Sequence, residues 1–492
     1  MTKEEYLRLI DEVNETGTYH ADWASLSNHK TPDWYYKGKF GIFIHWGLYS
    51  VPAYATEWYS RQMYNPETSE YQHHIDTYGP QNVFGYKDFI PMFKAEKFDP
   101  ASWARLFRQA GAKFVMPVCE HHDGFAMYDT DYNRWNASNM GPKRNVVGEL
   151  KEAVEQEGMV FCASTHRAEH YFFMNTGRTI DSDVNDEQYR DFYGPAYHCE
   201  ELNGNTIFTS TQDIFSPGPS VEWMEDWLVR TCELIDRYQP RILYFDWWIQ
   251  QINFKPYLKK VCAYYYNRAV QWGVEVTIDY KHEAFPPSVA TFDVERGALS
   301  GISPVPWQTD TAIGLRSWGY THDNEFKSSR QIIEDLIDIV SKNGMLLLNV
   351  GPRSDGTITD EETQVLIDIG KWLQINGEGI YETIPWKKYG EGEVNGDSGY
   401  FTDHIAKCFT SHDFRFTYKN GYLYAFCMAP DSNIVRIKSL GIKGEHDFLI
   451  ESVSVLGEYE VVGYTRNTEY LEIELNKNLN GELPVCLKIE IG

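Results

Sequence analysis

The sequence predicts an α/β protein, a (β/α)8-type barrel followed by a C-terminal antiparallel β-sandwich domain. From about residue 36 to about residue 385, short apolar runs alternate with segments of helical periodicity, a pattern typical of βαβ units and a parallel sheet. After residue 390, strand-like segments separated by turns replace this alternation. A chain of 492 residues can hold both a barrel and a second domain. We therefore expect a barrel over 1–385, with an N-terminal extension over 1–35, and a β-domain over 386–492.

Six apolar runs are the expected barrel strands. In chain order they are FGIFIHWG (40–47), AKFVMPVCEHHDGF (112–125), MVFCASTHRAEH (159–170), RILYFDWW (241–248), VEVTIDY (274–280) and GMLLLNVGP (344–352). Runs that are apolar at successive positions are typical of strands buried on both faces. Strands of this kind, each followed by a helix, fit a closed barrel better than an open sheet.

Six segments of helical period lie between or after these runs. They are PASWARLFRQAGA (100–112), VVGELKEAVEQEG (146–158), VEWMEDWLVRTCELIDRYQ (221–239), YLKKVCAYYYNRAVQWG (257–273), SSRQIIEDLIDIVSKNG (328–344) and DEETQVLIDIGKWLQING (360–377). Asn145 precedes the second segment as an expected N-cap, and several segments end at glycine, a common C-terminal signal. The β-domain is predicted from strand-like stretches at 421–429, 433–440, 447–457, 458–464, 470–475 and 484–492.

Composition restricts the class of function. Lys and Arg number 45 against 71 Asp and Glu, a net charge of −26, which argues against nucleic acid and anionic membranes as partners. The start of the chain, MTKEEYLRLIDEVNE, has no apolar leader, and no stretch of about 18 apolar residues occurs, so we expect a cytoplasmic protein. The eight cysteines form no C-x-x-C pair and are expected to be reduced core residues. Aromatic residues make up 15%, consistent with either sugar binding or large aromatic cores.

Polar side chains stand at the end of one predicted strand after another. The strand ends in a barrel meet at one face, where the chemistry of barrel enzymes takes place, so these side chains should converge on one pocket. In chain order they are His45 and Trp46; Glu120, His121, His122 and Asp123; His166, Arg167, Glu169 and His170; Asp246, Trp247 and Trp248; Asp279, Lys281, His282 and Glu283; and Asp293, Glu295 and Arg296.

Two chemistries suit such a pocket. A metal hydrolase would use His and Asp as ligands, but no His-x-His occurs, and neighbours such as His121 and His122 point to opposite faces of a strand. A glycosidase needs two carboxyl groups that flank the scissile bond. Asp246, between an apolar strand and two tryptophans, is a candidate nucleophile, and Glu295 is a candidate acid. The residues favour the glycosidase, with the metal hydrolase as the alternative.

Several motifs resemble the α-L-fucosidases of glycoside hydrolase family 29. They are KFGIFIHWGLYSVPAYATEWYSRQMY, KFVMPVCEHHDGFAMYDT, LYFDWW, SWGY and SKNGMLLLNVGPRSDGTI…GKWLQINGEGIYETIPW, which together span residues 39–386 in the order that the family uses. The C-terminal β-domain matches the family in position and type. The resemblance implies a retaining α-L-fucosidase that works through a covalent fucosyl-enzyme intermediate, without metal or cofactor.

The resemblance also implies roles for individual residues. Asp246 falls at the position of the nucleophile, although its FDWW context departs from the commoner Asp-Gly. The implied contacts with fucose are His45, Glu57, Trp58, His121, His122 and, beside the C5 methyl group, Trp318. His166 and Arg167 are further candidates for contact with the sugar or the leaving group. The implied partner is a fucosylated oligosaccharide or glycoconjugate. The sequence leaves open which fucosyl linkage is preferred, whether the protein also transfers fucose to acceptors, and whether it is a monomer or a homo-oligomer.

The acid/base occupies different positions within the family. Some members carry it in a Trp-Glu pair just before SWGY, where this chain has Trp307 and Gln308, and an amide cannot donate a carboxyl proton. Other members carry it about a dozen residues earlier, which here corresponds to Glu295. We therefore predict Glu295 as the acid/base and keep Glu283 in reserve. Gln308 also leaves open a fucose-binding protein that has lost catalysis.

Overall fold

The computed structural model describes residues 1–197, 200–201, 215–216, 218–394, 398–405, 407–443, 448–479 and 482–492. Parallel strands within this part of the chain form a closed barrel, because β1 pairs with β2 on one side and with β11 on the other. The barrel has eight strand positions, one of which is shared by the two short strands β3 and β4. In chain order they are β1 (Phe40–Ile44), β2 (Phe114–Glu120), β3 with β4 (Val160–Phe161 and Ala163–Thr165), β7 (Ile242–Phe245), β8 (Thr277–Lys281), β9 (Thr291–Asp293), β10 (Trp307–Ala312) and β11 (Gly344–Val350). The predicted barrel is confirmed.

Two barrel strands, β9 and β10, were not among the predicted runs. β9 has three residues, and β10 reads Trp-Gln-Thr-Asp-Thr-Ala, so neither is an apolar run. Every residue of β10 is nevertheless buried. Its polar side chains find hydrogen-bond partners inside the barrel, as buried polar groups must. No helix follows either β8 or β9 in this described stretch, so the helical pattern also gave no signal there.

Six of the described helices match the predicted segments, and the other six were not predicted. In chain order the helices are α1 (Lys3–Thr16), α2 (Trp23–Leu26) and α3 (Asp33–Gly38) before β1, then α4 (Tyr59–Gln62), α5 (Ser69–Tyr78), α6 (Pro100–Gln109), α7 (Val146–Gln156), α8 (Arg190–Tyr193), α9 (Val221–Tyr238), α10 (Lys255–Trp272), α11 (Ser329–Ser341) and α12 (Asp360–Asn376). Those that match are α6, α7, α9, α10, α11 and α12. The Asn145 side chain caps α7 by accepting from the Gly148 amide at 3.0 Å. Gly273 ends α10 with a φ of 69°, the left-handed geometry that favours glycine there.

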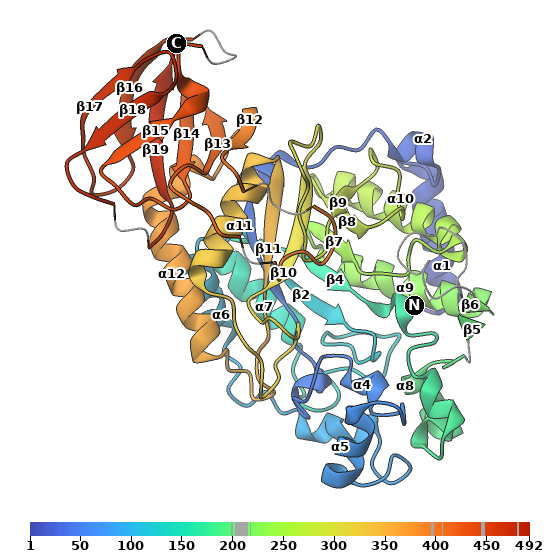
Figure 1. Cartoon of the computed structure of the whole chain (residues 1–492). Helices are drawn as coiled ribbons and strands as arrows, with labels where there is room; N and C mark the ends of the chain where they lie inside the picture. Colours follow the sequence, from blue (N-terminus) through green and yellow to red (C-terminus); the bar gives the residue numbers. More distant parts are fainter. Residues whose placement is uncertain are drawn as a thin grey trace.

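The C-terminal strands form two antiparallel sheets beside α11 and α12, as Figure 1 shows in orange and red. One sheet has the order β12 (Ile384–Glu391), β13 (Phe414–Lys419), β14 (Tyr422–Cys427), β19 (Val485–Ile491) and β16 (Ile450–Val455); the other has β15 (Ile434–Ile437), β18 (Leu471–Leu475) and β17 (Val461–Arg466). Their facing side chains make a core of their own. The remaining described strands, β5 (Glu200–Glu201) and β6 (Phe215–Ser216), pair antiparallel with each other.

A buried ion pair joins the β-domain to the barrel. The Asp338 carboxylate on α11 accepts from Arg415 on β13 at 2.5 Å and from Lys342 at 2.7 Å, and all three side chains are inaccessible to solvent. Trp372 on α12 also donates to the Pro484 carbonyl at 2.8 Å. Removing one member of such a buried pair leaves an uncompensated charge, which is strongly destabilising. The two parts are therefore held by specific contacts.

The cysteines of the described ranges agree with the prediction of core residues except at one position, Cys408, which is exposed. The seven described cysteines are all free, and all but Cys408 are buried. Cys199 lies outside the described residues. No described helix has the length and hydropathy needed to cross a membrane.

Candidate active site

Most residues to which the sequence assigned roles meet in one cavity at the carboxyl ends of the barrel strands. The cavity has a volume of about 470 Å³. Its lining includes His45, Glu57, Trp58, His121, His122, His166, Asp246, Glu295 and Trp318, to which the sequence assigned roles. Arg167 does not line it, because its guanidinium pairs with Glu120 and Asp226 instead.

Of the other strand-end side chains expected to converge there, Glu169, Trp247, Trp248 and Lys281 also line the cavity. The strand-end residues that do not line it are Trp46, Glu120, Asp123, Arg167, His170, Asp279, His282, Glu283, Asp293 and Arg296. The lining residues that the sequence missed are Arg61, Phe172, Asp310 and Phe401.

His45 follows β1 and is held by an amide at the end of the neighbouring strand. Asn349 on β11 donates from Nδ2 to the Trp318 carbonyl at 2.7 Å, so its Oδ1 accepts from His45 Nδ1, also at 2.7 Å. Burial holds the pKa of His45 well below its usual value, which keeps the ring neutral and leaves Nε2 as an acceptor. The Trp318 ring stacks on His45, with centroids 5.1 Å apart.

Trp46 turns away from the cavity. Its indole N–H donates to the Arg353 carbonyl at 2.9 Å, and its ring packs against Phe93, Phe98 and Trp103. Adjacent residues at a strand end point to opposite sides, so His45 faces the cavity while Trp46 packs in the surrounding core.

Two further histidines approach the Asp246 carboxylate. His122 Nδ1 donates to the His166 carbonyl at 2.9 Å, which places its Nε2 at 3.4 Å from Asp246 Oδ2. His166 Nδ1 lies 3.2 Å from the same oxygen. Burial lowers the pKa of His122 to about 3, so this ring is neutral at physiological pH. The ring that His122 presents to Asp246 is therefore a neutral imidazole.

A lysine bridges the two carboxylates predicted to react. Lys281 Nζ, on β8, lies 3.0 Å from Asp246 Oδ1 and 2.7 Å from Glu295 Oε2. A third carboxylate, Asp310 on β10, lies 3.4 Å from the same nitrogen and accepts from Tyr244 at 2.8 Å. Two hydrogen bonds of about 3 Å from one nitrogen place their acceptor oxygens at most about 6 Å apart. That separation is compatible with the 5 to 5.5 Å, roughly, of retaining glycosidases.

The two bridged carboxyl groups differ in protonation. Burial and the nearby carboxylates raise the pKa of Glu295 to about 7, against the opposing effect of Lys281. Burial also disfavours ionised Asp246, but Lys281 and His166 outweigh it and hold the pKa of Asp246 well below its usual value. Near neutral pH, one group is therefore an anion while the other can carry a proton. Pairs with divergent pKa values are typical of acid/base sites.

Glu57 fixes the opposite wall. Its Oε2 accepts from the Ser317 hydroxyl at 2.7 Å and from the Trp318 amide at 2.9 Å. The Arg296 guanidinium lies 4.5 Å from the centroid of the Trp318 ring. These contacts hold Trp318 in the orientation that it presents to the cavity.

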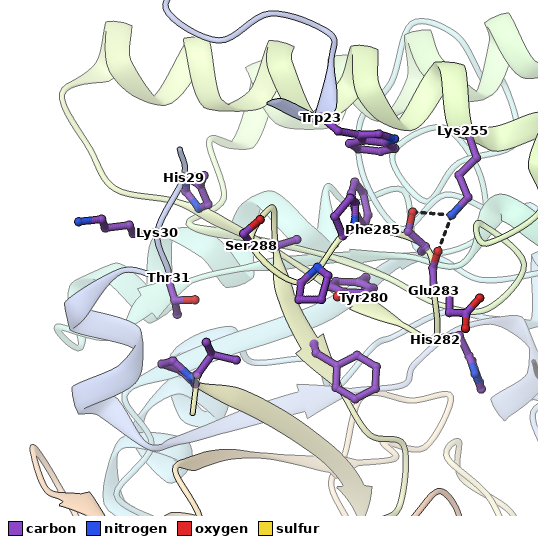
Figure 2. Close-up of a pocket in the computed structure, with 17 residues that line it drawn as sticks. Trp23, His29, Lys30, Thr31, Lys255, Tyr280, His282, Glu283, Phe285 and Ser288 are labelled. Atoms are coloured by element: carbon purple, nitrogen blue, oxygen red, sulfur yellow. Dashed lines mark hydrogen bonds between the residues drawn. The ribbon is translucent and has the colours of Figure 1, made fainter. Parts of the chain in front are cut away.

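Glu283 and Gln308 do not line this cavity. Glu283 is exposed and borders a separate cavity of about 830 Å³, where Lys255 donates to its backbone carbonyl (Figure 2). Gln308 is fully buried two residues before Asp310 on β10, and therefore one step deeper in the barrel. It accepts from Tyr35 and donates to Asp293 at 2.8 Å.

Some of these lining residues had a signal in the sequence, and others had none. Trp247, Trp248 and Lys281 were expected in the pocket from their places at strand ends, but the sequence assigned them no role. Asp310 lies on a strand too polar to be recognised as one. Phe401 comes from the segment between β12 and β13, whose backbone hydrogen-bonds to the Glu295 carbonyl, and no local pattern in the sequence reveals that contact.

The same cavity contains donor atoms that could hold a cation. Ligand atoms of His45, His121 and His166 lie within 4.8 Å of one another, as do those of His122, His166 and Asp246. Lys281 already places a positive charge beside Asp246, Glu295 and Asp310. The charge that a divalent ion would contribute there is thus present on a side chain.

Curated relatives correct the expected location. The chain is 30% identical over 441 residues to the tissue α-L-fucosidase of Homo sapiens, covering 87% of this chain and 84% of that protein. It is also 30% identical over 385 residues to the plasma α-L-fucosidase of Homo sapiens, covering 74% and 72% respectively. A cytoplasmic location is contradicted by relatives named for tissue and plasma. The expectation was wrong because a start without an apolar segment does not fix a compartment.

The fold and the family agree with the motifs. The structure of the Thermotoga maritima α-fucosidase in complex with fucose matches with a TM-score of 0.74 and 29% identity, covering 96% of this chain and all (100%) of that one. The family model described as α-L-fucosidase matches residues 7–378, which include all the predicted site residues. The chain belongs to the α-L-fucosidase family.

Proposed function

We propose that this protein is a retaining exo-glycosidase that hydrolyses α-L-fucosides, with Asp246 as nucleophile and Glu295 as acid/base. The observation that carries the residue assignment is the Lys281 bridge, which holds an ionised and a protonatable carboxyl group side by side in one cavity. Membership of the α-L-fucosidase family gives the class of substrate.

The first step transfers the fucosyl group to the enzyme. An Asp246 carboxylate oxygen forms a bond to the anomeric carbon while the bond from that carbon to the leaving oxygen breaks. Glu295 gives its proton to the leaving oxygen, so an alcohol departs and the fucosyl group remains as an ester of Asp246. Asp246 is suited to this step because it is ionised, and Glu295 because a pKa of about 7 leaves it substantially protonated near neutral pH.

The second step releases fucose. Glu295, now a carboxylate, takes a proton from water as the water oxygen attacks the anomeric carbon from the side that the leaving group vacated. The ester bond breaks, and Asp246 returns as a carboxylate. Two displacements at one carbon restore the original configuration. Lys281 stabilises the Glu295 anion between the two steps, because its ammonium lies 2.7 Å from Oε2.

The remaining predicted residues are proposed to bind the fucose ring. Neutral His45 offers Nε2 to a hydroxyl, and His121, His122, His166, Glu57 and Trp58 present further groups to the same cavity. Trp318 presents an aromatic face for the apolar side of the sugar. We propose residues 1–385 as the catalytic unit and 386–492 as the β-domain that packs against it.

The direct test is an assay with 4-nitrophenyl α-L-fucoside, followed by NMR to identify the anomer of fucose that forms first. We expect turnover with α-fucose as the first product. Binding of fucose without turnover would favour the fucose-binding alternative. That alternative rested on Gln308, which lies below the cavity, whereas Glu295 lines it.

Replacing Lys281 with methionine should move the pH profile toward higher pH. Lys281 lowers the pKa of both Asp246 and Glu295, so both values rise when the ammonium is removed, each by about 1 to 3 units. The acidic limb of kcat/KM, which reports ionised Asp246, and the alkaline limb, which reports protonated Glu295, should shift in the same direction. Lys281→Arg keeps the charge and should keep the limbs within about one unit; unmoved limbs in Lys281→Met would contradict this role.

Activity should be insensitive to chelators. Nucleophile, proton and positive charge all come from side chains, namely Asp246, Glu295 and Lys281. We expect kcat/KM after dialysis against EDTA and 1,10-phenanthroline to stay within about twofold of the untreated enzyme. A loss restored by added Zn²⁺ would instead support the metal-hydrolase alternative, with the two histidine clusters as ligands.

A further inference from the structure

Two aromatic rings stand next to the proposed acid/base. Trp247 follows Asp246 directly in the chain, and its indole N–H donates to Glu295 Oε2. The Phe401 ring lies nearly parallel to the Trp247 ring, with an interplanar angle of 8° and centroids 6.1 Å apart. Both rings line the active-site cavity, and 41% of Phe401 is exposed. This pair is called the aromatic platform below.

Backbone hydrogen bonds hold the segment that carries Phe401 against Glu295, the proposed acid/base. Its amide donates to the Glu295 carbonyl at 2.9 Å, and the next two amides, those of Thr402 and Asp403, donate to the Arg296 carbonyl at 2.7 and 2.9 Å. The Asp403 carboxylate also accepts from Thr311 at 2.6 Å and from Lys327 at 2.5 Å. The position of the Phe401 ring relative to Glu295 is therefore fixed by a short network.

The leaving group must lie on this side of the cavity. A general acid has to come within hydrogen-bonding distance of the oxygen that it protonates. The glycosidic oxygen therefore lies beside Glu295, and the first ring of the leaving group lies beside the side chains that contact Glu295. The platform is on that side, whereas Trp318 lies against His45 among the residues proposed to hold fucose.

We propose that Trp247 and Phe401 form the subsite for the leaving group, and that its ligand is a sugar ring whose apolar C–H face stacks on the platform. This inference rests on the proposed function and adds the class of leaving group to it. The subsite depends on a residue outside the part of the chain that the family model matches, because that match ends at residue 378. Preference for the leaving group is thus set partly by the segment after β12.

The same subsite would admit an acceptor sugar after the first step. A hydroxyl oxygen of the acceptor attacks the anomeric carbon of the Asp246 ester, its proton passes to the Glu295 carboxylate, and Asp246 is released. The product is a new fucoside, and no further reactant is needed. Stacking on the platform would raise the share of this transfer relative to hydrolysis by holding the acceptor in place.

The test compares two substrates that differ in the leaving group. 2′-Fucosyllactose places a sugar on the platform, whereas α-L-fucosyl fluoride releases an ion too small to reach it. The ratio of kcat/KM for the sugar substrate to that for the fluoride should fall about fivefold to tenfold in Phe401→Ala, the range expected for loss of one aromatic contact. Phe401→Trp should retain the ratio. Tyr464→Ala, which removes an equally exposed ring (41%) on β17, should leave it unchanged.

A second measurement uses transfer. With fucosyl fluoride as donor and lactose as acceptor, Phe401→Ala should lower the ratio of fucosyllactose to free fucose by a similar factor. A substrate ratio that does not change in Phe401→Ala, or rates that fall in parallel for both substrates, would overturn the subsite. Phe401→Leu, which keeps an apolar side chain without a ring, repeats the comparison if the alanine variant folds poorly. Failure of the wild-type enzyme to hydrolyse either substrate would instead reject the proposed function.

Discussion

Replacing Asp246 with alanine should lower kcat/KM for 4-nitrophenyl α-L-fucoside by about 10⁴-fold or more. Asp246 is contacted by Lys281 on β8, by His122 just after β2 and by His166 just after β4, so it stands at the centre of the ionisable groups in the cavity. Removal of a nucleophile typically costs this much because the covalent route is lost entirely. Steady-state kinetics on purified variants, with circular dichroism to check folding, makes the measurement.

The product formed with azide identifies the role of Asp246. In Asp246→Ala, azide can enter the space of the missing carboxylate and attack the anomeric carbon once, giving β-fucosyl azide. A matched control is Asp279→Asn, which alters another buried barrel carboxyl that hydrogen-bonds to Tyr35 and does not line the cavity. It should keep activity within severalfold. Retention of most activity in Asp246→Ala would reject Asp246 as the nucleophile.

Replacing Glu295 with alanine should have the second-largest effect, and that effect should depend on the leaving group. We expect kcat/KM for 2′-fucosyllactose to fall by about 10² to 10⁴-fold, the usual contribution of general acid catalysis. Fucosyl fluoride needs no proton on its leaving group, so its kcat/KM should fall much less. In the wild type, kcat/KM for 2′-fucosyllactose should fall as the pH rises above about 7, because Glu295 then loses the proton that it donates.

Azide also separates Glu295 from its alternative. In Glu295→Ala, azide should replace water in the second step and restore turnover, giving α-fucosyl azide because Asp246 still acts first. Glu283→Ala is the matched control and should behave like the wild type, since Glu283 is exposed and borders another cavity (Figure 2). Azide rescue confined to Glu283→Ala would reassign the acid/base to that residue.

The sequence was informative wherever apolar patterning and strand position coincide. β1, β2 and β11 are buried along their whole length, so each is visible as an apolar run. In a barrel such runs also indicate where the active site lies, because the carboxyl ends of all the strands meet at one face. His45, Asp246 and the other residues chosen on position and motif accordingly line one cavity.

The interior of the barrel was less predictable. Asp310 lies on β10, whose polar residues are satisfied by partners from other strands, and no local pattern reveals such pairing. Gln308 shares that strand, and only its depth in the barrel removes it from the cavity. The position of Gln308 in the chain therefore did not show how deep in the barrel its side chain lies.

The apolar runs, the helical segments between them and the spacing of the motifs were sufficient for the barrel, the family and the set of side chains at its mouth. Three-dimensional packing added the Lys281 bridge, the difference in protonation between Asp246 and Glu295, and the arrival of Phe401 from beyond β12. The physical reason is the distance along the chain over which each effect acts. Periodicity and turn chemistry act between neighbours in the chain, whereas a pKa or a platform depends on groups brought together from distant strands.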